Sequence, residues 1–234
     1  DSVHAHLRPS VHVPWEPTHT MSTVRITNVK VICTAPDGIR LVVVKVETSD
    51  PDLYGWGCAT FTQRPLAVVS AIEDYLKPMV IGRDPNDIED IWQTSFTSGY
   101  WRSGPIMFNA MSGIDQALWD IRGKAAGWPL YRLLGGVSRP IPAYAGGVAL
   151  GYQPPAQLVD EARPLIEMGY KAVKLRIGDT AKRDVERVAA VRKAFGDDLI
   201  ILTDANTGYD INAARAAMPG LEAQGVGWLE EPFP

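Results

Sequence analysis

The sequence predicts an α/β protein in two parts: an N-terminal α+β domain over residues 21–136, then the first half of a (β/α) TIM-like barrel over residues 137–234. Two observations support this fold class. Residues 22–62 form short alternating runs that are followed by helical patterns, as is typical of an α+β domain. After residue 136, strands and helices alternate strictly with a period of about 30 residues, the length of a βαβ unit.

Residues 1–20 differ in kind from the rest of the chain. They contain all four histidines of the sequence and show no hydrophobic periodicity. They also lack the charged and apolar segments of a secretory signal. We expect a disordered extension here.

The α+β domain is predicted to begin with an antiparallel meander of three strands. The strands are "VRITNVKVI", "IRLVVVKVETS" and "LYGWGCATF", with turns at Asp37-Gly38 and Asp50-Pro51. Helices are predicted over residues 66–79 and 86–97. A third helix, over residues 104–127, carries apolar side chains at a spacing of three to four and ends at Gly127.

The four predicted barrel strands are near-continuous apolar runs, as expected of strands that are buried on both faces. They are "IPAYAGGV", "KAVKLRIG", "DLIILTDAN" and "VGWLEE". No glycine-rich phosphate turn stands at a strand-to-helix junction, which favours a barrel over a dinucleotide-binding sheet.

The composition excludes several classes of partner. The net charge is −4 without basic clusters, which argues against nucleic acid. No apolar run approaches the roughly 18–20 residues that span a bilayer, so we expect no membrane association. Cys33 and Cys58 fit neither a CxxC motif nor a zinc spacing, and we expect two buried free thiols in a cytoplasmic protein.

Polar side chains stand at the carboxyl ends of three consecutive barrel strands, where barrels carry their reacting groups. They are Lys174 and Arg176, then Asp204 and Asn206, then Glu230 and Glu231. An internal Lys–Asp–Glu salt-bridge network is one interpretation. Because strand ends need no charge for stability and an unpaired buried charge is costly, three such strands in succession favour a functional site.

The residue types indicate the chemistry of this site. Carboxylate and amide oxygens, with no histidine after residue 19, suit Mg²⁺ rather than zinc. Lys174 and Arg176 alternate along one strand, so both side chains lie on the same face. A divalent ion beside two cations suits a substrate carboxylate and the enolate that forms when its α-proton is removed.

Several specific stretches carry a resemblance to a known family. They are "GWG" (55–57), "GRDP" (82–85), "IEDIWQ" (88–93), "YWRSGPI" (100–106), "GIDQALWDIRGK" (113–124), "PLYRLLGG" (129–136), "VKLR", "LTDAN" and "LEEP". Through them, residues 22–234 resemble the mandelate racemase/muconate lactonizing enzyme family of the enolase superfamily. Within it, the chain most resembles the sugar-acid dehydratases of galactonate and mannonate type.

The resemblance implies roles for individual residues. Asp204 and Glu230 would be two Mg²⁺ ligands, and Asn206 would lie beside the metal or the substrate carboxylate. Glu231 would support the site or pair with a cation. The α+β domain would cap the barrel mouth, and its loops would contact substrate through Thr60, Arg64, Trp101 and Arg102. Packing between domains is an equal alternative for Trp101.

One position departs from the family pattern. The Lys-x-Lys pair of the racemases is Lys174-Leu-Arg176 here. Arginine keeps its proton at any accessible pH, so Arg176 is a poor general base and a good partner for an oxyanion. Lys174 is left with two catalytic roles, as a base or as a group that binds the carboxylate.

The resemblance implies a Mg²⁺-dependent lyase that dehydrates a sugar acid (an aldonate or aldarate) through abstraction of the α-proton and a metal-stabilised enolate. The alternatives are a racemase or epimerase of a 2-hydroxy acid, and a non-catalytic metabolite-binding or regulatory relative. The family's third acidic ligand and His–Asp base would lie on later strands. We therefore expect an N-terminal fragment that is inactive alone, from a full-length protein that forms a homo-oligomer.

Overall fold

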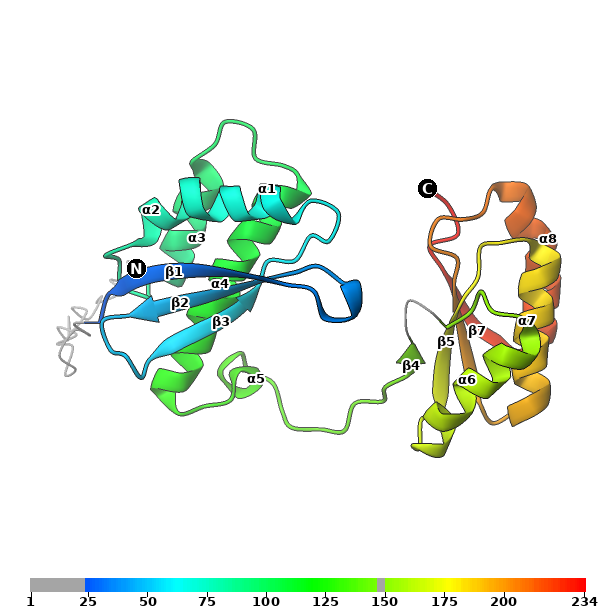
Figure 1. Cartoon of the computed structure of the whole chain (residues 1–234). Coiled ribbons are helices and arrows are strands. Elements are labelled where there is room, and N and C mark those ends of the chain that lie inside the picture. Colours follow the sequence, from blue (N-terminus) through cyan, green and yellow to red (C-terminus); the bar gives the residue numbers. More distant parts are fainter. Residues whose placement is uncertain (1–23, 147–149) are drawn as a thin grey trace, which may run out of the picture. The chain divides into compact units, whose positions relative to one another are not determined.

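The structure is a computed structural model that describes residues 24–146 and 150–234. It divides into two compact units, which we treat separately (Figure 1); unit 1 ends at Ser138 and unit 2 begins at Arg139. The boundary lies two residues from the one that the sequence predicts. The extension expected over residues 1–20 lies outside the described residues.

Unit 1 begins with the predicted meander. Strands β1 (Ile26–Thr34), β2 (Leu41–Thr48) and β3 (Tyr54–Cys58) form an antiparallel sheet in the order β1-β2-β3. A 3₁₀ turn, η1 (Pro36–Gly38), joins the first two strands. The inward side chains of β2, Val42, Val44 and Val46, are fully buried, and burial alternates residue by residue along the strand.

The helices of unit 1 confirm the three predicted helical segments. Helix α1 (Pro65–Ser70) continues through a π-helical turn, η2 (Ala71–Leu76), into α2 (Lys77–Val80). Helix α3 (Ile88–Thr97), the long α4 (Pro105–Ala126) and the short α5 (Leu130–Leu133) follow. Helix α4 ends at Gly127, whose left-handed conformation (φ 63°) closes it as the sequence predicts.

Glycine allows α4 to pack directly on β3. A Cβ on Gly57 would lie 1.9 Å from the carbonyl oxygen of Gly113, and a Cβ on Gly55 would lie 1.9 Å from that of Ala117. Any side chain at these positions would push the helix away from the sheet. The "GWG" stretch and Gly113 of α4 are therefore explained by close backbone packing.

Side chains of α4 also pair with the backbone of β3 at its free edge. The Gln116 carbonyl accepts from the Cys58 amide at 3.1 Å, and the Asp120 carboxylate accepts from the Trp56 amide at 2.9 Å. The Lys124 ammonium donates to the Tyr54 carbonyl at 2.8 Å. Three helical residues at a spacing of four thus satisfy an edge that would otherwise expose unpaired backbone groups.

Unit 2 is the predicted half barrel. Strands β4 (Ala145–Gly146), β5 (Ala172–Arg176), β6 (Ile200–Asp204) and β7 (Val226–Glu230) form a parallel sheet in chain order. Helices α6 (Pro155–Glu167), α7 (Ala181–Phe195) and α8 (Ile211–Ala223) lie on one side of it (Figure 1). The strand residues packed in the buried core of this unit include Val173, Leu175 and Ile201.

The expectation for the cysteines is half right. Both thiols are free, but Cys33 and Cys58 are exposed, so the prediction of burial is wrong. Cys33 is the second-last residue of β1, whose last two residues are both exposed, whereas Cys58 lies with Trp56 on the exposed face of β3, opposite the buried Gly55 and Gly57. Within residues 24–146 and 150–234, no helix combines the length and apolar character that crossing a membrane requires.

Candidate metal and substrate site

The register of the parallel sheet brings the predicted site residues together. Arg176 is paired with Asp204 across β5 and β6, and Asp204 is paired with Glu230 across β6 and β7. These three residues end their strands at one level. Lys174 lies two residues before the end of β5, on the same face as Arg176, as the alternation predicts.

Lys174 holds the two carboxylates. Its ammonium donates to Asp204 Oδ2 at 2.9 Å and to both oxygens of Glu230 at 3.1 Å. The Asp204 side chain is 3% exposed, whereas that of Glu230 is 37% exposed. The Lys–Asp–Glu network considered from the sequence is therefore present, and its carboxylates converge on a single cationic group.

Arg176 adds a second cation with an unused donor. Its Nη1 atom lies 2.8 Å from Asp204 Oδ2, an ion-pair contact. The same atom is buried, yet among the described residues it has no hydrogen-bond partner of acceptable geometry. Buried donors are rarely left without an acceptor, so this N–H group is a candidate to bind an oxygen that the described residues do not supply.

These contacts shift two pKa values in opposite directions. The hydrogen bond to Asp204, opposed by burial and assisted by Glu230, raises the pKa of Lys174 above its ordinary value. Burial opposes ionisation of Asp204, but hydrogen bonds from Lys174 and the Asn206 amide, with the charge of Arg176, lower its pKa overall. Lys174 is therefore held in its protonated form and, with these partners, is a poor proton acceptor.

The turns that follow β6 and β7 have unusual backbone conformations. Asn206, Thr207 and Glu231 have positive φ angles of 45°, 61° and 42°. Such angles are uncommon outside glycine and rarer still for a β-branched residue such as threonine. The Thr207 amide donates to the Glu231 carbonyl at 2.7 Å, and this bond joins the two turns. Strained backbone of this kind is concentrated at functional sites.

Asn206 and Glu231 contribute through their backbones. The Asn206 amide donates to Asp204 Oδ1 at 2.9 Å, while its side chain is exposed beside the site. Glu231 is exposed and forms none of the ion pairs between described residues. Of the two roles expected for Glu231, support of the site is the one its backbone contact favours.

The donor set can be tested against Mg²⁺. Asp204 and Glu230 present oxygens to one cation, and hard oxygen donors are the ligands that Mg²⁺ prefers. Among residues 24–146 and 150–234 there is no group of three or more His, Cys, Asp or Glu side chains arranged to hold a metal. The two carboxylates therefore fit part of a magnesium site, whose other positions water and substrate oxygens commonly occupy.

Two predicted substrate contacts lie in unit 1, in the segment after β3. The Thr60 hydroxyl accepts from the Val42 amide at 3.0 Å, so it already holds this segment against β2. Arg64 is exposed, and its guanidinium donates to the Gln63 carbonyl at 2.7 Å. Their contact with substrate stays a prediction.

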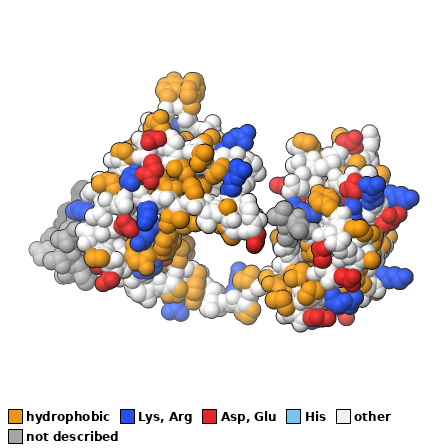
Figure 2. Space-filling view, in the orientation of Figure 1, with side chains coloured by type: hydrophobic (Ala, Val, Ile, Leu, Met, Phe, Trp, Pro, Cys, Tyr) orange, Lys and Arg blue, Asp and Glu red, His pale blue; other side chains and the backbone are white. Residues whose placement is uncertain are grey.

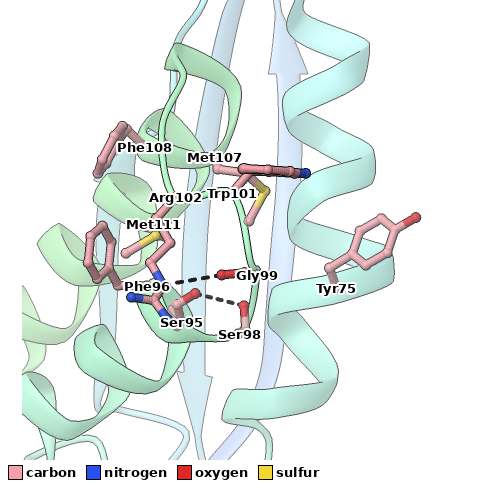
Figure 3. Close-up of a pocket in the computed structure, with 10 residues that line it drawn as sticks. All are labelled: Tyr75, Ser95, Phe96, Ser98, Gly99, Trp101, Arg102, Met107, Phe108 and Met111. Atoms are coloured by element: carbon pink, nitrogen blue, oxygen red, sulfur yellow. Dashed lines mark hydrogen bonds between the residues drawn. The ribbon is translucent and has the colours of Figure 1, made fainter.

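The other two, Trp101 and Arg102, help to line a cavity of about 260 Å³ in unit 1 (Figure 3). Trp101 is 85% exposed, and Figure 2 shows further hydrophobic side chains on the visible face of this unit. Arg102 donates to the Gly99 carbonyl at 3.2 Å and lies over the Phe96 ring at 5.9 Å. Because most of the lining is aromatic or methionine, the cavity itself is a poor match for a polyhydroxylated acid.

Unit 2 also contains a buried polar cluster that the sequence did not predict, formed by Asp184, Arg187 and Tyr209. Asp184 is fully buried and accepts from the Tyr209 hydroxyl at 2.7 Å and from Arg187 at 2.9 Å. One feature of the sequence could have indicated it: Asp184 and Arg187 are three residues apart, and Arg187 directly precedes the apolar Val188 of the predicted helix. A charged pair at this spacing beside an apolar stripe indicates an ion pair next to the core.

Comparison with known proteins identifies the family of the chain. The model for the mandelate racemase/muconate lactonizing enzyme N-terminal domain matches residues 16–135, and the enolase C-terminal domain-like model matches residues 157–234. The D-galactonate dehydratase family member Dd703_0947 of Musicola paradisiaca is 56% identical over 162 residues, which are 68% of this chain and 37% of that protein. A D-galactonate dehydratase family member of Catenulispora acidiphila is 38% identical over 254 residues, covering 95% of this chain and 57% of the relative.

Solved structures show the same fold. An enolase from Pantoea ananatis with bound D-gluconate and Mg is 40% identical, with a TM-score of 0.79 over 90% of this chain and 60% of that one. A member of the enolase superfamily from Polaromonas sp. JS666 is 45% identical, with a TM-score of 0.82 over 90% of this chain and 59% of that one. The chain thus spans about 60% or less of the length of these relatives.

Proposed function

The chain belongs to the mandelate racemase/muconate lactonizing enzyme family of the enolase superfamily, and on that premise we propose that the full-length protein is a Mg²⁺-dependent hydro-lyase that dehydrates a sugar acid. The observation that carries this proposal is the convergence of Asp204 and Glu230 on one cation, beside the unsatisfied donor of Arg176. Relatives named as D-galactonate dehydratase family members, and a structural neighbour with bound D-gluconate and Mg, support the substrate class.

Each residue has a defined part in this proposal. Asp204 and Glu230 hold Mg²⁺, which as a Lewis acid stabilises the negative charge that develops on the substrate carboxylate. Arg176 donates to a carboxylate oxygen through its Nη1 atom, which forms an ion pair with Asp204 but no hydrogen bond among the described residues. Lys174, whose ammonium pairs with both carboxylates, adds a second positive charge, and we propose that a residue other than Lys174 and Arg176 accepts the α-proton.

A screen of the full-length protein against aldonates and aldarates tests the proposal. With Mg²⁺, we expect one or a few acids to lose water and give a 2-keto-3-deoxy acid, which semicarbazide detects. EDTA should stop the reaction, and added Mg²⁺ should restore it. A protein that dehydrates none of these acids, although it is folded and loaded with Mg²⁺, would contradict the proposal.

Replacing Arg176 with Lys separates the shape of this cation from its charge. The lysine keeps the charge but loses the planar guanidinium, so contacts to the developing oxyanion should be lost. We expect kcat/KM to fall by about 30- to 1000-fold, equivalent to about 2–4 kcal/mol, with little change in the unfolding midpoint.

Arg183→Lys is a matched control, because Arg183 lies on α7 with a side chain that is 66% exposed. It should keep the parent's kinetics. If instead the Arg176→Lys enzyme gained exchange of the α-hydrogen with solvent, position 176 would belong to a base, and the dehydratase interpretation of this strand would be wrong.

A further inference from the structure

The buried polar cluster of unit 2 is directed at the turns that follow the strands. Asp184 Oδ2 accepts from the amides of Gly178 and Asp179, both at 3.0 Å, in the turn after β5. The same oxygen accepts from the hydroxyl of Tyr209, in the turn after β6, at 2.7 Å. One carboxylate on α7 therefore holds two consecutive turns.

Arg187 connects the same cluster to a third turn. Its guanidinium pairs with Asp184 Oδ1 at 2.9 Å and donates to the carbonyls of Tyr152 and Gln153 at 3.0 and 3.1 Å, after β4. A buried ion pair that served only the core would need none of these loop contacts. Such a pair is also weak evidence for stability, because removing two charges from water is costly.

Tyr209 holds the turn after β6 through its hydroxyl and through its backbone amide. The Tyr209 ring is 2% exposed, and its backbone amide donates to the Pro232 carbonyl, beyond β7, at 3.0 Å. Gly208 separates Tyr209 from Asn206 and Thr207, which have left-handed conformations. A strained turn persists only where its surroundings hold it. The hydrogen bond from the Tyr209 hydroxyl to the Asp184 carboxylate anchors this turn to α7.

This turn reaches the predicted metal ligand directly. The Asn206 amide donates to Asp204 Oδ1 at 2.9 Å, while Oδ2 of the same carboxylate faces Lys174 at 2.9 Å. If the turn relaxed, the Asn206 amide would leave Oδ1, and the carboxylate could rotate.

We propose that Asp184 is a positioning residue, which acts through the Tyr209 hydroxyl to hold the 205–209 turn and so to orient the carboxylate of Asp204. The proposal rests on the proposed function in one respect, that Asp204 binds Mg²⁺. Groups that orient metal ligands typically alter metal affinity or activity by about 10- to 100-fold when they are removed.

The test compares Tyr209→Phe with Tyr152→Phe in the full-length protein. Tyr209→Phe removes only the hydroxyl, and Asp184 keeps its bonds to Gly178, Asp179 and Arg187, so the fold should survive. Tyr152→Phe is the matched control, because its hydroxyl donates to the Ile177 carbonyl at 2.8 Å in the same region and forms no hydrogen bond with the described residues 205–209.

We expect Tyr209→Phe to weaken Mg²⁺ binding by about 10-fold, measured by titration calorimetry with Mg²⁺ alone. Hydrogen exchange should become faster at the amides of Asn206 and Thr207. With saturating Mg²⁺, kcat should return most of the way to that of the parent. Tyr152→Phe should lower the unfolding midpoint to the same extent as Tyr209→Phe does, but it should leave the Mg²⁺ affinity unchanged.

Equal Mg²⁺ affinity in the parent and in Tyr209→Phe would overturn the proposal, as would an equal loss of affinity in both variants, which would indicate general loosening. Asp184→Asn, if it folds, should resemble Tyr209→Phe or be more severe. A parent that binds Mg²⁺ but dehydrates no sugar acid would overturn the proposed function alone, because the affinity comparison needs no turnover.

Discussion

Replacing Asp204 with Asn in the full-length protein is expected to abolish Mg²⁺ binding and lower kcat/KM by at least about 1000-fold, equivalent to about 4 kcal/mol. Asp204 has the most buried carboxylate at the strand ends and touches Lys174, Arg176 and the Asn206 amide. The amide of asparagine fills the same space but is a weaker ligand and leaves two cations opposite one remaining carboxylate. Titration calorimetry with Mg²⁺ and steady-state kinetics measure the two effects.

Glu231→Gln is the control for this substitution, since it makes the same chemical change at an exposed acid close to the site. It should bind Mg²⁺ nearly as the parent does. If Asp204→Asn kept the parent's Mg²⁺ affinity while Glu231→Gln lost it, the two acids would have been assigned to the wrong roles.

The second large effect concerns stability. Gly57→Ala is expected to destabilise unit 1 by about 3 kcal/mol or more, because the new Cβ would lie 1.9 Å from the carbonyl oxygen of Gly113. The obstacle is backbone, so no side-chain rotation can relieve it, and the helix must move away from β3. That movement would also stretch the bonds from Gln116 and Asp120 to the edge of the strand.

Denaturant unfolding, followed by the fluorescence of the tryptophans in unit 1, measures this loss. Gly99→Ala is the matched control, since a Cβ there would meet its nearest neighbour at an ordinary 3.5 Å. A Gly57→Ala protein as stable as Gly99→Ala would show that α4 and β3 are not packed as closely as described.

The order of the strands and helices could be predicted from the spacing of apolar residues, because each element buries one face and the apolar residues on that face recur at the period of a strand or a helix. Apolar alternation in "IRLVVVKVETS" and continuous apolar runs in "DLIILTDAN" distinguish the antiparallel sheet from the parallel one. The convergence of Lys174, Asp204 and Glu230 followed from the same logic. Parallel strands of equal length must place their carboxyl ends side by side.

The remaining features depend on contacts that no local pattern encodes. Tyr209 and Asp184 are 25 residues apart, and nothing in either neighbourhood predicts that they meet. The exposure of Cys33 depends on how far β1 extends beyond the core, which periodicity does not define. Similarly, the Thr60 hydroxyl is bound to the backbone of Val42, 18 residues away.

Proton NMR of the full-length protein with Mg²⁺ and its best sugar-acid substrate in D₂O tests the central claim most directly. If the protein is a dehydratase, the substrate should be consumed and a 2-keto-3-deoxy acid should accumulate. Lys174 should not act as a base, so no deuterium should enter the α-position of the unreacted acid. Deuterium at the α-carbon of a 2-hydroxy acid, without loss of water, would instead show a racemase or epimerase. Tight binding of the acid with neither exchange nor elimination would show a protein that binds a metabolite without catalysis.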